Sequence, residues 1–232
     1  MFIPIGDNQI KGGVFPYISY GLIALNISIY LFQTSLSQIQ LESFVLHYGA
    51  IPDNIMHGKQ FYALFSNMFL HGSWMHLIGN MAFLWVFADN IEATIGHARF
   101  LTFYIVGGLA ASAAHIYFNM GSMIPTIGAS GAIAAVMGAY IIMFPRSKIK
   151  TFVVVFVVNI SAFIFLGLWI VQQAYYGTTS LYQGDINVGG VAWWAHIGGF
   201  AFGFAFGILF KDLYLGENAT VYLEGHNKPP LV

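Results

Sequence analysis

The sequence contains no cysteine and very few charged residues. The absence of cysteine from its 232 residues excludes disulfides, thiolate metal sites and cysteine nucleophiles. Asp, Glu, Lys and Arg together make up 7% of the chain, whereas average soluble domains carry about 25%. So few charges cannot cover the surface of a soluble protein, and the mean hydropathy of +0.71 agrees. The chain is therefore expected to be an integral membrane protein that lies in a lipid bilayer.

Other features are also missing, and each absence narrows the class of protein to which the chain can belong. The net charge is −1 and there is no basic cluster, so no nucleic-acid partner is indicated. The N-terminus has a single lysine and no small-residue cleavage site after a short apolar core, which argues against a removable signal peptide. No internal repeat is evident, which argues against a transporter or channel built from inverted repeats.

Long uncharged runs are abundant and predict the fold class. A membrane-spanning helix needs about 20 apolar residues, and the run from Phe100 to Pro145 is long enough for two. The sequence therefore predicts an all-α polytopic bundle of six transmembrane helices. Their expected positions are residues 15–33, 75–94, 99–118, 128–144, 151–174 and 191–210. The fourth is short because Pro125 precedes it and Pro145 follows it.

The basic residues predict the orientation of this bundle. With the N-terminus inside, only Lys59 of the eight lysines and arginines lies outside. We therefore expect a cytoplasmic N-terminal segment (1–14), a membrane domain (15–210) and a cytoplasmic, loosely ordered C-terminal tail (211–232). The expected location is a cell membrane, either the plasma membrane or a bacterial inner membrane.

A long connection, residues 34–74, follows the first predicted helix on the outer side. Phe61, Phe65 and Phe69 recur at helical spacing in its second half. Two interpretations stay open at this point. The segment is either a helix that lies in the outer membrane interface or an ordinary loop helix packed on the bundle.

Unusual polar residues occur near the outer ends of the second, fourth and sixth predicted helices. His76 and Asn80 share one face of the second helix, Ser130 opens the fourth, and His196 lies in the sixth. At a rise of 1.5 Å per residue, all four lie roughly 5–10 Å below the outer boundary. Ionisable groups at membrane depth are costly and indicate function. We therefore predict one shared cavity, with His115 of the third helix close by.

Each of these residues also has a purely structural explanation. A serine in a membrane helix usually bonds to its own backbone, and histidine or asparagine can bridge helices. Four such residues at one depth favour a common site. Serine and histidine together are the minimum set for acyl transfer, and the free N–H groups at a helix N-terminus can stabilise an oxyanion.

Small residues indicate which helices approach closely. The sixth predicted helix has glycines at every fourth position, and the fourth has small residues at the same spacing, which lets backbones pack tightly. These residues are Gly199, Gly203 and Gly207 in the sixth helix, and Gly131, Ala134, Ala135 and Gly138 in the fourth. Such faces often mean plain helix packing, but here the contact would bring His196 against Ser130.

Three motifs together resemble those of the rhomboid family of intramembrane serine proteases. They are Phe69–Asn80 (FLHGSWMHLIGN), Gly128–Gly131 (GASG) and Ala195–Phe200 (AHIGGF), and the likeness covers about residues 15–210. GASG alone would be weak evidence, whereas the combination in this order is highly specific. The resemblance implies an endopeptidase that cleaves single-pass or polytopic membrane-protein substrates near the outer face, with no metal and no cofactor.

The resemblance also implies individual roles. Ser130 would be the nucleophile and His196 the general base, without an acidic third member. His76, Asn80 and the Ser130 backbone N–H would form the oxyanion hole. Residues 34–74 would be the membrane-embedded L1 loop, and the fifth helix would be the candidate lateral gate.

This sequence departs from the family pattern in two places. The Trp-Arg pair of many L1 loops is not visible. Ala134 stands where some members carry an aromatic residue against the base, so Trp193 or Trp194 is expected to support His196 instead.

Two other functions remain as alternatives. A rhomboid-like pseudoprotease would bind or escort membrane proteins without cleaving them. A metalloprotease would use His71, His76, His115 and His196, but no His-Glu-x-x-His motif is present.

Overall fold

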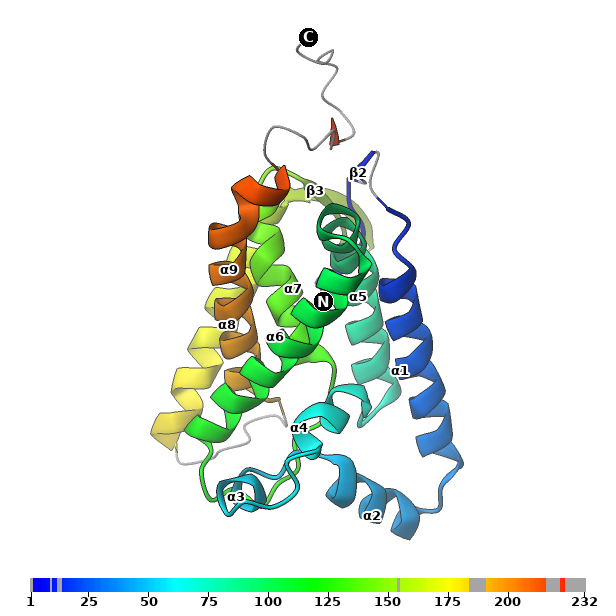
Figure 1. Cartoon of the computed structure of the whole chain (residues 1–232), viewed down its shortest axis with the longest axis vertical. Coiled ribbons are helices and arrows are strands. Elements are labelled where there is room, and N and C mark those ends of the chain that lie inside the picture. Colours follow the sequence, from blue (N-terminus) through cyan, green and yellow to red (C-terminus); the bar gives the residue numbers. More distant parts are fainter. Residues whose placement is uncertain are drawn as a thin grey trace.

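The computed structural model describes residues 2–8, 10–11, 14–153, 155–183, 191–215 and 222–223, and these are mostly helical. Within them, six helices of at least 14 residues run along the length of the molecule (Figure 1). They are α1 (Tyr17–Ser35), α5 (Trp74–Ile95), α6 (His97–Phe118), α7 (Ser130–Met143), α8 (Ala162–Gln183) and α9 (Trp193–Leu215). Each overlaps one of the spans predicted from the sequence.

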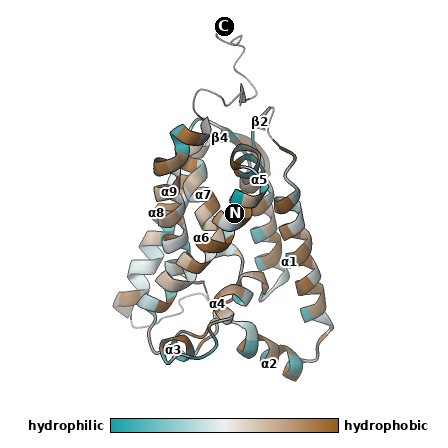
Figure 2. Ribbon diagram, viewed as in Figure 1, coloured by the Kyte–Doolittle hydropathy of each residue, from teal (hydrophilic) through white to brown (hydrophobic). Residues whose placement is uncertain are grey.

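Hydropathy and length distinguish some of these helices from the others. Among the described residues, His97–Phe118 and Trp193–Leu213 are long and apolar enough to cross a membrane, and α7 is a shorter apolar helix. Apolar residues are nonetheless common along the other long helices as well (Figure 2). The number of six crossings therefore stays a prediction.

The start of the predicted fifth span is wrong, because residues 148–153 and 156–161 form two paired β-strands. Strands β3 (Lys148–Val153) and β4 (Phe156–Ser161) pair antiparallel, and β1 (Phe2–Gly6) adds to the outer edge of β3 in the order β1-β3-β4. Buried and exposed residues alternate along β3, and both strands are rich in β-branched and aromatic residues, which favour strands. The all-α expectation misses this sheet.

Helix α8 begins only after the hairpin. It runs from Ala162 to Gln183, so it ends nine residues later than the predicted span. A second, two-stranded pairing joins β2 (Ile10–Lys11) to β5 (Tyr222–Leu223). The predicted loose tail starts too early, because α9 continues to Leu215 and residues 211–215 are helical. Most of the rest, residues 216–221 and 224–232, lies outside the described residues, so its expected looseness stays a prediction.

The L1 segment forms several short helices at one end of the bundle (Figure 1). They are α2 (Gln38–Tyr48), α3 (Pro52–Met56), α4 (Ala63–Ser66) and the 3₁₀ helix η1 (Asn67–Phe69). The side-chain amide of Asn67 donates to the carbonyls of Ala63 and Leu64 at 2.6 and 2.8 Å, where the last turn of α4 tightens into η1.

Because the helix tightens there, the three phenylalanines expected on one helix face differ in exposure. Phe61 and Phe65 are 59% and 47% exposed, whereas Phe69 is only 7% exposed. Helix α4 packs on α6, as the loop-helix interpretation expected. Whether the exposed pair enters the membrane interface stays a prediction.

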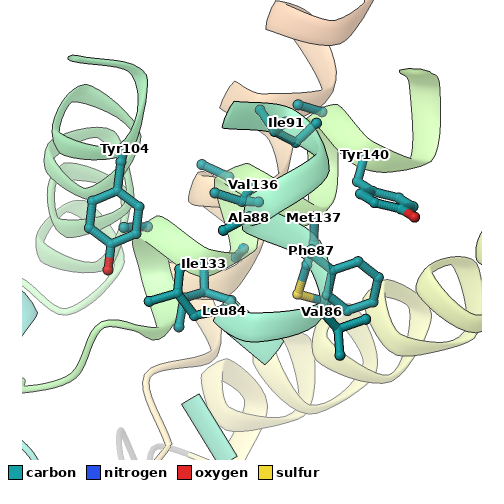
Figure 3. Packing of buried hydrophobic residues seen from close by; sticks show 14 of the residues in the cluster. Leu84, Val86, Phe87, Ala88, Ile91, Tyr104, Ile133, Val136, Met137 and Tyr140 are labelled. Atoms are coloured by element: carbon teal, nitrogen blue, oxygen red, sulfur yellow. The ribbon is translucent and has the colours of Figure 1, made fainter. Parts of the chain in front are cut away.

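The core lies around α7, which is enclosed by its neighbours. Twelve of its 14 residues are buried. Figure 3 shows their packing against residues of α5 and α6. The labelled side chains are Leu84, Val86, Phe87, Ala88 and Ile91 from α5, Tyr104 from α6, and Ile133, Val136, Met137 and Tyr140 from α7. A residue at the start of α7 is therefore held by a helix that is packed on nearly all sides.

The predicted glycine face of α9 does pack on α7. A Cβ atom at Gly199 would lie 2.1 Å from the carbonyl oxygen of Gly131, and one at Gly203 would lie 1.8 Å from that of Ala135. No side chain fits at such distances, so the two backbones are in direct contact. A Cβ at Gly138 of α7 would likewise lie 2.2 Å from the carbonyl oxygen of Phe200. The prediction of close packing between these helices is confirmed.

Candidate active site

Ser130 is the first residue of α7, and the turn before it depends on glycine. Gly128 has φ +133°, a conformation that L side chains rarely adopt. A Cβ atom there would also lie 2.8 Å from the ring of His76. Because Ser130 opens the helix, its backbone N–H is among the first-turn donors that have no acceptor within the helix.

His196 reaches Ser130 from the second turn of α9. Its Nε2 lies 2.8 Å from the Ser130 Oγ, although the two residues are 66 positions apart in the chain. The backbone contact between α7 and α9 places them together, since Gly199 lies on Gly131 one turn further along. The sequence predicted this pairing, and the structure brings the two side chains within hydrogen-bonding distance.

The other ring nitrogen of His196 has a partner that the sequence did not predict. Nδ1 lies 2.7 Å from the Oε1 of Gln173 on α8. A carbonyl oxygen can only accept, so Nδ1 carries the proton in this arrangement and Nε2 is free to accept from the serine hydroxyl. A signal was available, because Gln172 and Gln173 are adjacent amides in a long uncharged run.

Aromatic rings also pack against the imidazole, one from α8 and one from α9. The Trp169 ring lies 5.6 Å from that of His196, centroid to centroid, at an interplanar angle of 36°. Trp193 meets the imidazole edge-on at 6.4 Å, whereas Trp194 stacks on Phe118 at 3.7 Å. Of the two tryptophans expected to support the base, Trp193 contacts it, but Trp194 packs elsewhere and Trp169 was missed.

A cavity of about 680 Å³ opens beside the Ser130–His196 pair. All four residues predicted to share a site line it, and so does His115. The lining residues are Gly72, Ser73, Met75, His76, Asn80, His115, Ile124, Pro125, Thr126, Ile127, Ser130, Val191, Ala192 and His196. A peptide backbone that entered this space would meet the serine hydroxyl, the imidazole and the helix N-terminus together.

His76 and Asn80 lie on the α5 side of the cavity. The Asn80 side-chain amide donates to the Nε2 of His71, at a distance of 3.0 Å. The His71 ring in turn lies 5.1 Å from that of His76, edge to face. Burial lowers the pKa of His71 to about 4, and the neighbouring His76 adds to this effect. A neutral His71 accepts from one amide hydrogen of Asn80 and leaves the other for the cavity.

His115 closes the far side of the cavity through contacts with the loop before α7. Its Nε2 lies 2.8 Å from the Thr126 hydroxyl, and the Asn119 amide donates to its backbone carbonyl at 2.7 Å. Throughout the described part of the chain, no three His, Asp or Glu side chains are grouped so that they could hold a metal ion. The histidines of the metalloprotease alternative therefore do not gather into a ligand set.

Chemically, this arrangement can carry out acyl transfer. A serine hydroxyl beside an unprotonated imidazole nitrogen is an activated nucleophile, and the helix N-terminus beside it can accept a developing negative charge.

Comparison with known proteins shows the family to which the chain belongs. The family model described as the Rhomboid domain matches residues 58–212, which is more than half of the chain. The chain belongs to the rhomboid family, most of whose members are intramembrane serine proteases, and it is a membrane protein.

Several curated relatives match parts of the chain. It is 34% identical over 83 residues to the presenilin-associated rhomboid-like protein A, mitochondrial, of Danio rerio, covering 35% of this chain and 22% of the relative. It is 26% identical over 139 residues to rhomboid protein 1, mitochondrial, of Saccharomyces cerevisiae (58% and 38%). The putative rhomboid protease YdcA of Bacillus subtilis is 26% identical over 152 residues (62% and 70%).

These matches concern two points, namely how much of each relative the chain covers and which membrane the relatives are named for. The chain spans well under half the length of the zebrafish and yeast relatives. Both of these relatives are named as mitochondrial, so the comparisons do not support the expectation of a cell membrane. A membrane location is what they support.

Proposed function

We propose that the protein is a serine-type intramembrane endopeptidase that cleaves transmembrane helices of other membrane proteins near the outer face. The observation that carries this proposal is the 2.8 Å approach of His196 Nε2 to Ser130 Oγ in a cavity at a helix N-terminus. Family membership alone would not suffice, because some rhomboids are inactive.

The proposed reaction begins when a substrate helix enters the bundle sideways and unwinds at the cavity. Ser130 Oγ attacks the exposed peptide carbonyl while His196 Nε2 takes the hydroxyl proton. The tetrahedral oxyanion is stabilised by His76, Asn80 and the Ser130 backbone N–H, and each such donor is worth about 3–4 kcal/mol. His196 then protonates the leaving amine, and the C-terminal half of the substrate departs.

A water molecule completes the cycle. Activated by His196, it attacks the acyl-enzyme ester and releases the N-terminal half of the substrate together with the free Ser130 hydroxyl. The reaction needs no redox step and no metal ion. Unpaired polar groups in lipid cost several kcal/mol each, so a cavity lined by these residues favours water in it.

We also propose how the helices cross the membrane. Helices α1, α5, α6, α7, α8 and α9 would each cross the membrane, with both chain ends on the cytoplasmic side and the cavity toward the outer face. The distribution of lysine and arginine supports this orientation, because only Lys59 would lie outside.

Cleavage of a reporter substrate tests the proposal. Wild type, Ser130→Ala and His196→Ala are reconstituted in liposomes with a fluorescent transmembrane substrate. Ser28→Ala is the matched control, because the Ser28 hydroxyl is exposed on α1 and donates to the Ala24 carbonyl of its own helix. We expect wild type and Ser28→Ala to cleave, and both active-site variants to lose at least about 10³-fold in kcat.

A second measurement separates the alternatives. A fluorophosphonate probe should label wild type at Ser130 and leave Ser130→Ala unlabelled. Cleavage that survived Ser130→Ala would refute the serine mechanism, and inhibition by a chelator would favour metal chemistry. A wild type that binds the substrate but neither cleaves it nor reacts with the probe would be a pseudoprotease.

A further inference from the structure

Helix α8 turns one of its two adjacent glutamines inward and the other outward. Gln173 is 4% exposed and contacts His196, whereas Gln172 is exposed on the surface of the helix. Helix α8 packs against both α7 and α9, so it holds this side chain against the proposed catalytic pair. A buried amide in an apolar helix costs free energy unless it is paired, and the imidazole supplies the partner.

We propose that Gln173 is a positioning residue that fixes the tautomer and orientation of the base His196. This inference rests on the proposed function and deepens it by adding a third member to the Ser130–His196 pair. The Gln173 Oε1 accepts the Nδ1 proton at 2.7 Å, and this leaves the Nε2 lone pair directed at the Ser130 Oγ, 2.8 Å away. The opposite tautomer would place a proton between Nε2 and the hydroxyl and would prevent proton removal.

Trp169 strengthens this argument because it lies four residues before Gln173, on the same face of α8. Its ring packs against the imidazole at 5.6 Å, so one helix face supplies both a hydrogen-bond acceptor and an aromatic wall. On α7, Ala134 is fully buried but has no ring to offer. The support that some family members would take from the nucleophile's own helix therefore comes from α8 in this chain.

The Gln173 amide differs from the carboxylate of a catalytic triad because it carries no charge. A triad aspartate orients the histidine and also stabilises the imidazolium that forms during catalysis. Gln173 can do the first, but as a neutral group it does the second only weakly. At membrane depth an unpaired carboxylate would be costly whenever the histidine is neutral, whereas an amide avoids that cost.

The structure therefore leads us to expect a defect in the chemical step when the acceptor is removed. Gln173→Met keeps the length of the side chain but removes the acceptor, and Gln172→Met is the matched control on the outer face of the same turn. We expect Gln173→Met to lower kcat on the order of 10²-fold with little change in KM, less than the ~10⁴-fold loss when a triad aspartate becomes asparagine. Gln172→Met should cleave at the wild-type rate.

Gln173→Glu provides a readout that a merely structural residue would not change. The carboxylate still accepts from Nδ1 but also stabilises the imidazolium, so the acidic limb of the pH–activity profile should move to higher pH. The other histidines that line the cavity, His76 and His115, are unchanged in this variant. The proposal would be overturned if Gln173→Glu kept the acidic limb at its wild-type pH and Gln173→Met kept the wild-type kcat.

A spectroscopic test does not depend on cleavage or on the stability of a variant. ¹⁵N NMR of histidine-labelled wild type in micelles, with His196→Gln to assign the signal, should show His196 protonated at Nδ1 and unprotonated at Nε2. The reverse tautomer would overturn the proposal even if Gln173→Met failed to fold. If wild type showed the expected tautomer but cleaved no substrate, the protease function would fail while the positioning contact would stand.

Discussion

Two clusters of polar side chains lie at different depths of the same bundle. The cluster that we propose to be reactive, called the reactive cluster, lies beside the cavity and consists of the half-buried Ser130 and His196 and the buried Gln173 and Asn80. The closed cluster consists of Asp7, Asn90, Tyr140 and Ser147, each at most 7% exposed. On α7, ten residues separate Ser130 from Tyr140, which is roughly 15 Å along the helix.

Hydrogen bonding within the closed cluster is dense. The Tyr140 hydroxyl bonds to the Asp7 carboxylate and lies 2.9 Å from the Ser147 hydroxyl, while the Asn90 amide donates to Asp7 at 2.5 Å. Those groups join the N-terminal segment to α5 and α7. The reactive cluster differs because its serine faces a cavity of about 680 Å³ at a helix N-terminus. A cluster of polar residues therefore does not by itself indicate a reactive site, and the open volume beside a helix N-terminus is what distinguishes the proposed one.

The comparison predicts that changes in the reactive cluster act on the reaction, and of the three variants compared next, Asn80→Ala should have the largest effect. Loss of one oxyanion donor should lower kcat by about 10²–10³-fold, equivalent to about 2.7–4 kcal/mol of transition-state stabilisation. The rate is measured per folded molecule, with folding checked by circular dichroism. Asn54→Ala, in the L1 loop, is the control and should keep the wild-type kcat. A wild-type rate for Asn80→Ala would remove Asn80 from the oxyanion hole.

His71 sharpens the comparison because it lies beside the reactive cluster but should act on stability. Its pKa in the folded protein is about 4, below the ordinary value of 6.5, so the unfolded chain binds the proton more tightly. The stability it contributes is fully present above pH 6.5 and is lost as the pH falls toward 4, by up to about 3 kcal/mol. His71→Gln should flatten this part of the pH dependence, measured by denaturant unfolding in micelles.

Gln172→Met is the control for that measurement. It replaces an exposed side chain that has no titratable group, so the pH dependence of unfolding should stay as in wild type. Parallel stability curves for His71→Gln and wild type between pH 7 and pH 4 would contradict the prediction.

A change in the closed cluster should lower the stability of the fold and leave the reaction unchanged. Of the three predicted effects, this one should be the smallest. Tyr140→Phe removes one donor to Asp7, and an unsatisfied buried group costs about 1–3 kcal/mol. The free energy of unfolding should fall by that amount, while kcat per folded molecule stays unchanged. Tyr175→Phe, at an exposed position on α8, should change neither quantity. A loss of kcat in Tyr140→Phe without a loss of stability would show that the two clusters are coupled.

Local sequence patterns were enough to predict most of the helix positions and the convergence of Ser130, His196, His76 and Asn80. Both depend on properties that are read along the chain, namely apolar length, the position of charges and the depth of polar residues. The α7–α9 packing was predictable for the same reason, because glycine at every fourth position is a local signal.

The features that were missed depend on contacts distant in sequence or on the wrong periodicity. The hairpin strands at residues 148–153 and 156–161 are rich in β-branched and aromatic residues, but in a long apolar run this local signal did not outweigh the length expected of a membrane helix. Their pairing with each other and with Phe2–Gly6 is distant in sequence and was not visible. The Gln173–His196 contact was missed because amides are uncharged and the inward face of α8 was unknown. Likewise, the Glu92 carboxylate accepts from the Ser19 N–H at 2.7 Å across 73 positions, and no local pattern indicates that.

The pairing of β1 with β3 imposes a parity rule on the chain. Hydrogen-bonded strands must lie on the same side of a bilayer, so the chain between Gly6 and Lys148 crosses it an even number of times or not at all. Four long helices occupy that interval. The pairing of β2 with β5 extends the same rule to nearly the whole chain, so an odd number of crossings between Lys11 and Tyr222 is incompatible with this structure.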